Sequence, residues 1–252
     1  MKKNGRQGII VGMKRILLLS CWLPLLLSAC GLDTFYYLDP PVSRHFIDEA
    51  DSSSQDPSNH YVSFVTASNA DSGDVFQGTA VYYRLYNSAS SLLSHKVSIE
   101  SINDDSSDQG MNRLIGWGYQ ALTTSASTAA NLVPSGGAKE VSMRLFNETP
   151  TGGGSSTTYQ YPAGASVDGR SIGIPLRCFD SKTFSFSSTA SQDEVNSVPE
   201  EGQEDVSFTA SAGTSTWYVA LYAVSTGMSP SLTPVYSKVT YLGSLAITPT
   251  SN

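Results

Sequence analysis

The side chains that could carry out chemistry are few and widely separated in this chain. Its histidines, His45, His60 and His95, do not stand at the i, i+3 or i, i+4 spacing of a metal-binding pair. Neither Gly-x-Ser-x-Gly nor His-Glu-x-x-His occurs. Cys178 has only Arg177 beside it to stabilise a thiolate, which favours a buried structural thiol over a nucleophile. We therefore expect no enzymatic activity, no metal and no cofactor, with a hydrolase whose site assembles only in the fold as a distant alternative.

The acidic stretch "NDDSSDQG" brings Asp104, Asp105 and Asp108 together before a glycine. A calcium loop of the EF-hand type needs glycine at its sixth position and an acid at its twelfth. Counted from Asp104, the glycine comes seventh and the twelfth residue is Ile115. The stretch is therefore interpreted as a solvated loop that caps a helix near Met111.

The stretch "MKRILLLSCWLPLLLSACG", which begins at Met13, has the layout of an export signal. Lys14 and Arg15 precede an uncharged run over residues 16–27. This run is too short for a membrane-spanning helix, which needs about 20 apolar residues. Basic residues before a short apolar run are typical of a signal peptide, starting at either Met1 or Met13.

The end of this run, "LSAC", resembles the lipobox of bacterial lipoproteins. The resemblance implies that residues 1–29 are removed and that Cys30 is acylated, with two or three acyl chains forming a stable membrane anchor. We therefore expect a lipid-anchored protein of the cell envelope, in the outer membrane. Whether it faces the periplasm or the cell surface is left open.

Removal of residues 1–29 makes the remaining chain strongly acidic. The removed segment holds five of the 15 lysines and arginines and no acid, so the net charge changes from −7 to −12. Such a surface repels phosphate backbones, which excludes nucleic acid as a partner. Cys21 leaves with the segment and Cys30 is acylated, so Cys178 has no disulfide partner within the chain.

The mature chain divides into a tether and a β-rich domain. Residues 30–59 carry two consecutive prolines and the polar stretch "DEADSSSQDPSNH", which predict a lipid-anchored tether and a loop. From residue 60 to 252, apolar and polar residues alternate in short runs such as "GTAVYYRLYNS" and "TWYVALYAV". This period of two, in β-branched and aromatic residues, predicts antiparallel strands in a sandwich.

Two of these runs resemble strands of the fibronectin type III family. Gly78, Val81, Tyr83 and Arg84 look like its third strand, and "TWYVALYAVSTGMS" over residues 216–229 looks like its sixth. Three positions differ from the family pattern, where Phe64 replaces a tryptophan, Thr79 a tyrosine, and Trp217 the tyrosine of the corner motif. The lipobox, "YLDPP" and these strands together also resemble uncharacterised lipoproteins of spirochaetes.

The resemblance implies a mainly β, immunoglobulin-like or fibronectin type III-like antiparallel sandwich with a long insertion. The insertion covers residues 88–204, between the third and sixth strands. One short helix is predicted within it, because Met111, Leu114, Ile115 and Tyr119 stand at helical spacing.

In such a sandwich the third and sixth strands are neighbours, so their outward side chains share one surface. This surface would carry a cation among four aromatic rings: Tyr82, Arg84, Tyr86, Tyr218 and Tyr222. Tyrosines around an arginine suit a sugar face or a protein contact. The alternative is that the insertion folds over these tyrosines and buries them as a second core.

The sequence therefore predicts a membrane-anchored, non-enzymatic binding module for a glycan, a peptide or a protein of the envelope or the extracellular space. A structural lipoprotein that assembles or spaces envelope components is the alternative. Ligand and oligomeric state are left open.

Overall fold

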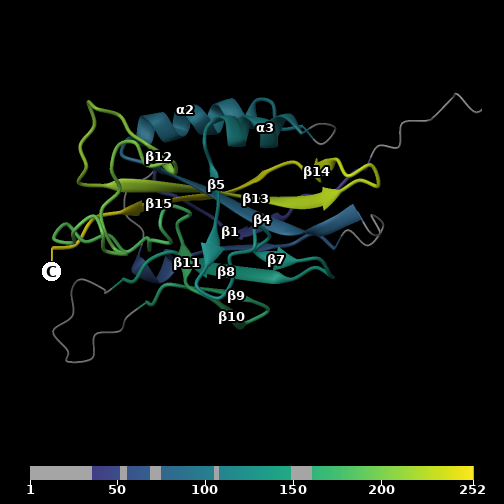
Figure 1. Ribbon diagram of the computed structural model, residues 1–252, viewed down its shortest axis with the longest axis horizontal. Coiled ribbons are helices and arrows are strands. Elements are labelled where there is room, and N and C mark those ends of the chain that lie inside the picture. The colour runs from purple at the N-terminus through teal and green to yellow at the C-terminus, as the bar shows by residue number, and fades with distance from the viewer. Residues whose placement is uncertain (1–35, 52–55, 69–74, 105–107, 149–160, 252) are drawn as a thin grey trace, which may run out of the picture. The chain divides into compact units, whose positions relative to one another are not determined.

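The computed structural model describes residues 36–51, 56–68, 75–104, 108–148 and 161–251 (Figure 1). The expected signal peptide and Cys30 lie outside the described residues. Within the described part of the chain, every helix is too short or too polar to cross a membrane.

The first sheet consists of five antiparallel strands. Their order is β1 (Val42–His45), β3 (Val62–Val65), β8 (Glu140–Arg144), β9 (Gly164–Val167) and β10 (Arg170–Gly173). The segment 88–204, expected as an insertion, thus supplies three of the five strands and completes the sandwich. The expected tether over 30–59 also differs, since it contains β1 and, in the second sheet, β2.

The second sheet is built around two long strands. Its order is β12 (Val206–Ser207), β4 (Phe76–Tyr86), β13 (Trp217–Met228), β15 (Thr240–Ile247) and β2 (Ile47–Asp48). Short strands extend it, with β5 (Gln120–Ala121) and β7 (Val133–Pro134) on β4 and β14 (Pro234–Tyr236) on β13. The described residues also form a separate pair, β6 (Thr123–Thr124) with β11 (Pro175–Leu176), and a 3₁₀ turn (Pro57–Asn59).

The expected mainly β sandwich is confirmed, and its long strands pair antiparallel as predicted, whereas the short strands β12 and β2 pair in parallel with β4 and β15. Strands β1, β3 and β8 lie side by side in one sheet, and β4, β13 and β15 in the other. Alternate residues fill the space between the sheets: Val62, Phe64, Val141, Met143, Tyr83, Leu85, Trp217, Val219 and Leu221. Phe64 and Trp217, which depart from the family pattern, are both fully buried here.

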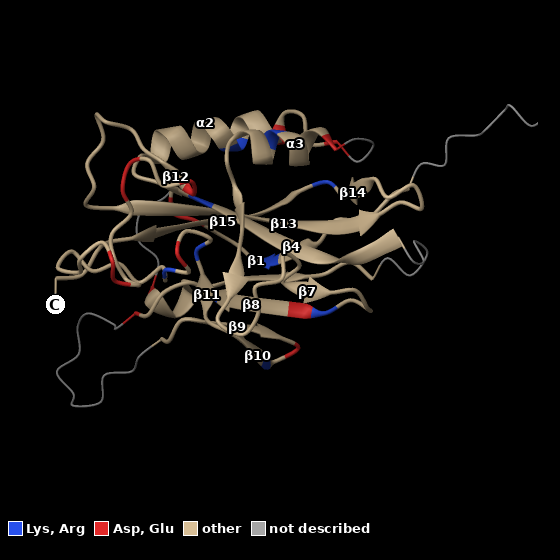
Figure 2. Cartoon of the chain, in the orientation of Figure 1, with Lys and Arg blue, Asp and Glu red and all other residues tan. Residues whose placement is uncertain are grey.

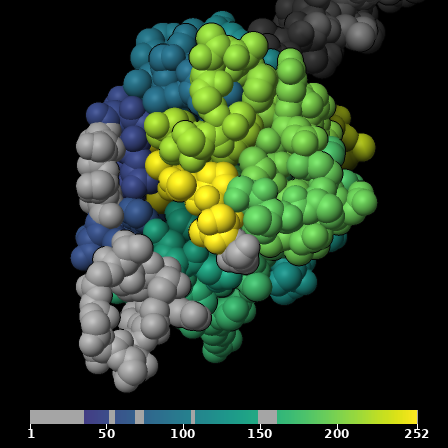
Figure 3. All heavy atoms as spheres, turned by 90° about the vertical axis from the view of Figure 1, so that its left-hand side faces the viewer, coloured from purple at the N-terminus to yellow at the C-terminus, as the bar shows by residue number. Residues whose placement is uncertain are grey.

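A segment with little regular structure closes one end of the sandwich. Phe184 and Phe186 insert into the core between the sheets. The backbone of Phe186 accepts a hydrogen bond from Thr250 N at 3.0 Å, which joins this segment to the end of the chain. Figure 3 shows this end, where green residues surround the yellow carboxyl-terminal residues.

Two helices cover the outer face of the second sheet (Figure 1). The expected helix is α3 (Gln109–Gly116), which begins after Asp108 and buries Met111 and Leu114. The other, α2 (Ala89–Glu100), was not predicted. Its serines are modest helix formers, and its apolar residues do not form one stripe, since Val97 is 64% exposed.

A buried ion pair fixes the segment that leads into β12. Arg177 and Asp205 are both fully buried. Arg177 Nε and Nη2 each donate to a carboxylate oxygen of Asp205 at 2.8 Å. The Tyr83 hydroxyl donates to the same carboxylate at 2.7 Å, which ties the pair to β4. This carboxylate therefore compensates a cation that has no access to water.

We predict that Asp205→Asn lowers the free energy of unfolding by about 3–5 kcal/mol, because it leaves the Arg177 charge uncompensated in the core. Tyr83→Phe removes two hydrogen bonds, one donated to Asp205 and one accepted from the backbone N of Cys178, but it keeps the ion pair, so its cost should be smaller, about 1–3 kcal/mol. Urea denaturation of the two variants and the wild type measures both values. Equal losses would contradict the role assigned to the ion pair.

Candidate ligand groove

The pairing of β4 with β13 brings the expected tyrosine surface together. Tyr82 lies opposite Tyr222, and Tyr86 opposite Tyr218, in an antiparallel register that also places Arg84 opposite Ala220. All five predicted side chains therefore belong to the outer face of the second sheet.

The tyrosine surface is closed at its centre, because α2 and α3 cover it. Tyr86 is 0% exposed and Tyr222 is 1% exposed, and both belong to an apolar cluster shared with α2 and α3. Tyr82, Arg84 and Tyr218 are half-buried. The alternative, that the segment after β4 buries these tyrosines as a second core, is confirmed for Tyr86 and Tyr222.

Arg84 is occupied in positioning the end of α3. Its guanidinium donates to the backbone oxygen of Gly118 and, at 3.0 Å, to that of Val206. Gly118 has φ +77°, and a Cβ there would lie 2.0 Å from Arg84 Nη1, so any other residue would strain the backbone and displace the guanidinium. The cation expected to face a ligand instead holds the chain where α3 turns back toward β4.

A hydrogen-bonded network links this second core to the helices. His95 Nδ1 lies 3.0 Å from the Tyr86 hydroxyl, and the Tyr86 hydroxyl donates to that of Tyr119 at 3.2 Å. Burial, assisted by the charge of Arg84, lowers the pKa of His95 to about 4. A neutral His95 with its proton on Nδ1 donates to Tyr86, which satisfies both bonds.

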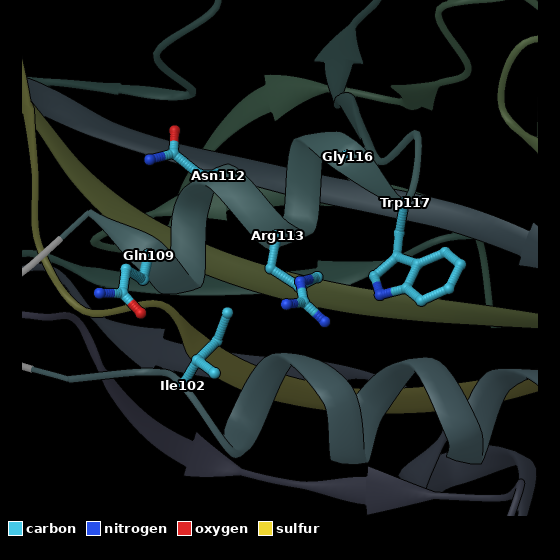
Figure 4. A pocket seen from close by; sticks show the side chains of 6 residues that line it. All are labelled: Ile102, Gln109, Asn112, Arg113, Gly116 and Trp117. Carbon is cyan, nitrogen blue, oxygen red and sulfur yellow. The ribbon is translucent and has the colours of Figure 1, made fainter.

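A groove of about 510 Å³ lies between the end of α2 and α3 (Figure 4). Six residues line it: Ile102, Gln109, Asn112, Arg113, Gly116 and Trp117. Gln109, Arg113 and Trp117 follow one another at intervals of four, so they form one stripe along α3 and its end. Figure 4 shows Gln109 and Arg113 on the side of Ile102, whereas Asn112 points the other way.

Trp117 and Arg113 are held in place by α2. The Trp117 ring stacks on His95 with centroids 3.7 Å apart and an interplanar angle of 18°. Ser98 Oγ accepts from Arg113 Nη1 at 2.6 Å and lies 3.4 Å from Trp117 Nε1. Contacts to α2 thus hold both the half-buried indole and the guanidinium. An aromatic surface beside hydrogen-bond donors suits a sugar or a polar peptide.

The sequence prediction concerned the apolar stripe of α3 and missed its polar one. The spacing of Gln109, Arg113 and Trp117 was visible in the sequence, but nothing there showed that Ile102, just after α2, would form the second wall. The acidic loop expected before Met111 lies only partly within the described residues, and the Asp108 side chain makes no capping hydrogen bond.

A second polar cluster joins the two sheets at His60. Its Nδ1 lies 2.5 Å from Glu148 Oε1 and its Nε2 lies 3.0 Å from Glu49 Oε1. Burial opposes protonation, but the two carboxylates together raise the pKa of His60 to about 9. Arg144 Nη1 donates to the other oxygen of Glu148 at 2.9 Å. His60 is therefore a cation between two carboxylates, and this arrangement connects β2, β3 and β8.

Cys178 lies beside the core ion pair. Its backbone N donates to the Tyr83 hydroxyl at 2.6 Å, and its Sγ donates to Glu204 at 3.4 Å. Burial and the neighbouring carboxylates raise the pKa of the Cys178 thiol to about 12. The sulfur is thus protonated at neutral pH and is a poor nucleophile. No cluster of potential metal ligands occurs among the residues that the structure describes.

The chain was compared with protein families, curated proteins and solved structures. Neither a family model, nor a curated protein, nor a solved structure matches the chain.

We predict that His60 makes the stability of the protein depend on pH. Its pKa in the fold, about 9, lies above its ordinary value of 6.5, so its contribution is complete below about pH 6.5 and is lost as the pH rises through 9. The free energy of unfolding of the wild type should therefore fall by roughly 1–3 kcal/mol more than that of His60→Gln between pH 6 and pH 10.

Denaturant titrations of both proteins at each pH measure this difference. Tyrosines and lysines titrate alike in the wild type and in the variant, so their contribution cancels. Glu49→Gln removes one of the two carboxylates and should flatten the dependence only in part. A wild type and a His60→Gln variant with parallel pH profiles would exclude a protonated His60 in the fold.

Proposed function

We propose that this chain is a lipid-anchored lipoprotein of the bacterial cell envelope that acts as a non-enzymatic binding module for a glycan. The lipobox ending at Cys30 supports the anchor, which we assign to the outer membrane. The groove between α2 and α3 supports the binding role. The sandwich acts in this proposal as the rigid base on which the two helices are held.

The observation that carries the proposal is the fixed indole of Trp117 at the groove. One side of its ring is covered by His95, and the side chain is only half-buried. Sugar rings stack on such flat aromatic surfaces and need hydrogen-bond partners at their edges. Arg113 and Gln109 provide them, since both are exposed and lie along the same stripe.

Arg113 also favours a ligand with an acidic group. Its guanidinium bonds to the neutral Ser98 hydroxyl, and within the described residues it forms no ion pair. An exposed arginine with unused N–H groups can bind a carboxylate by donating a hydrogen bond to each of its two oxygens. A saccharide with a carboxylate, such as a uronic acid, therefore fits the groove better than a neutral sugar.

The sheet edges favour a binding module over a structural lipoprotein that assembles by strand pairing. The edge strands β2 and β12 have two residues each. Strands β1 and β10, which border the first sheet, carry register shifts at Ser43–His45 and Ser171–Gly173. Short and irregular edges discourage the addition of a strand from another chain.

A hydrolase has less support than either role. The Cys178 thiol is protonated, and the His60 imidazole is held as a cation by two carboxylates. Neither group is prepared to act as nucleophile or base at neutral pH.

We predict that Trp117→Ala weakens glycan binding about tenfold or more, because it removes the stacking surface. An array of immobilised acidic and neutral saccharides identifies the ligand, and calorimetry with that saccharide measures the affinity. Ile115→Ala is the matched control, since Ile115 is 50% exposed on α3 and does not line the groove. A folded protein that binds no saccharide, or equal losses in the two variants, would contradict the proposal.

A further inference from the structure

The turn between β13 and β14 presents a leucine in an unfavourable state. Leu232 is 79% exposed, more than any other large hydrophobic residue that the structure describes. Its backbone has φ +62°, in the left-handed region that favours glycine or asparagine. A leucine at this position is therefore unfavourable for two reasons, because its apolar side chain is in water and because its backbone conformation is strained. Strain of this kind is retained where the side chain has a task.

The turn is rigid, so the exposure of Leu232 is not that of a loose loop. Leu232 N donates to Ser229 O at 2.9 Å, and Ser229 N donates to Thr233 O at 2.9 Å. Thr233 N also donates to Ser229 Oγ at 3.1 Å. Two prolines, Pro230 and Pro234, flank the leucine and restrict the backbone further. The fold thus holds one apolar side chain outward at a fixed position.

The chain on both sides of Leu232 carries no charged residue over a long stretch. From residue 206 to residue 237 the sequence contains no acidic or basic residue. Figure 2 shows the strands β13 and β14 and their turn without colour from charged residues. No charge in this segment would need to be dehydrated if the tip of the turn entered an apolar environment.

This turn belongs to the same end of the domain as the first described residues. Tyr36 packs with Val235 of β14 against the small cluster of Leu38, Val75 and Phe76. The next residue, Tyr37, is 51% exposed. Cys30 precedes Tyr36 by six residues, and six residues of chain span at most about 22 Å. A bilayer that holds acyl chains on Cys30 is therefore within reach of this end.

We propose that the β13–β14 turn is a membrane contact, in which Leu232 enters the interface of the lipid bilayer and Tyr37 lies at the level of the headgroups. Apolar side chains at such an interface gain from leaving water, and tyrosine is enriched at headgroup depth. The contact would hold the domain in one orientation on the anchor. The inference rests on the proposed acylation of Cys30, which supplies the proximity.

Spin labels on the full, processed chain test the contact. A label is attached at Leu232→Cys or, as a control, at the exposed Ser191→Cys, both in a Cys178→Ser background. The acylated protein is reconstituted on vesicles of phosphatidylethanolamine and phosphatidylglycerol. On vesicles, the label at 232 should be at least tenfold less accessible to a water-soluble relaxation agent than on the unbound chain in detergent-free buffer. It should also become more accessible to oxygen. The label at 191 should show neither change.

The outcomes separate this inference from the proposed anchor. Mass spectrometry reports independently whether Cys30 carries acyl chains. A label at 232 that stays in water on an acylated, vesicle-bound chain overturns the membrane contact and leaves the anchor standing. Protection seen only in whole envelopes assigns the turn to a protein partner, which also overturns it. A Cys30 without acyl chains overturns both proposals.

A second variant tests whether Leu232 serves the fold instead. Asparagine tolerates the left-handed conformation, so Leu232→Asn should raise the midpoint temperature of unfolding in solution. In the same variant, a label on Ser231→Cys should no longer gain accessibility to oxygen on vesicles. A lowered midpoint would show that the leucine stabilises the domain, and this would overturn the inference.

Discussion

The structure depends on a pair of strands that is apolar on both faces. In β13 the residues from Val219 to Gly227 alternate between two faces, yet all of them are buried. The same holds for β4, whose Tyr83 points into the sandwich and whose Tyr86 points away from it. Strands that are apolar on both faces are stable only when both faces are covered. The second sheet therefore needs a layer on each side.

The cover on the outer side determines where the candidate groove lies. Helices α2 and α3 occupy the face that a simple sandwich would leave open, and they are tied to the sheet by charge as well as by apolar contact. Lys96 of α2 pairs with Asp48 of β2 and lies 4.6 Å from the ring centre of Tyr241. With the sheet closed, the candidate groove lies on the helices, where the Trp117 ring stacks on His95.

The sequence predicts the strands better than it predicts what covers them. The period of two in β4 and β13 shows local geometry directly, and it was enough to place Tyr82 and Tyr222 on one shared face. The helix α2 could not be found in this way, because its stability comes from the tertiary burial of Leu92 and Ile99 and not from its own composition. The groove depends on that helix, so it too was hidden.

The most direct test of this account is the chemical accessibility of individual tyrosines in the folded protein. Nitration with tetranitromethane, mapped by mass spectrometry, should modify Tyr37, which is 51% exposed, and leave Tyr86 and Tyr222, at 0% and 1%, unmodified until the protein unfolds. Modification of Tyr86 and Tyr222 at the rate of Tyr37 in the native state would contradict the account. The helices would then not close the outer face, and the groove between them would not be a fixed site.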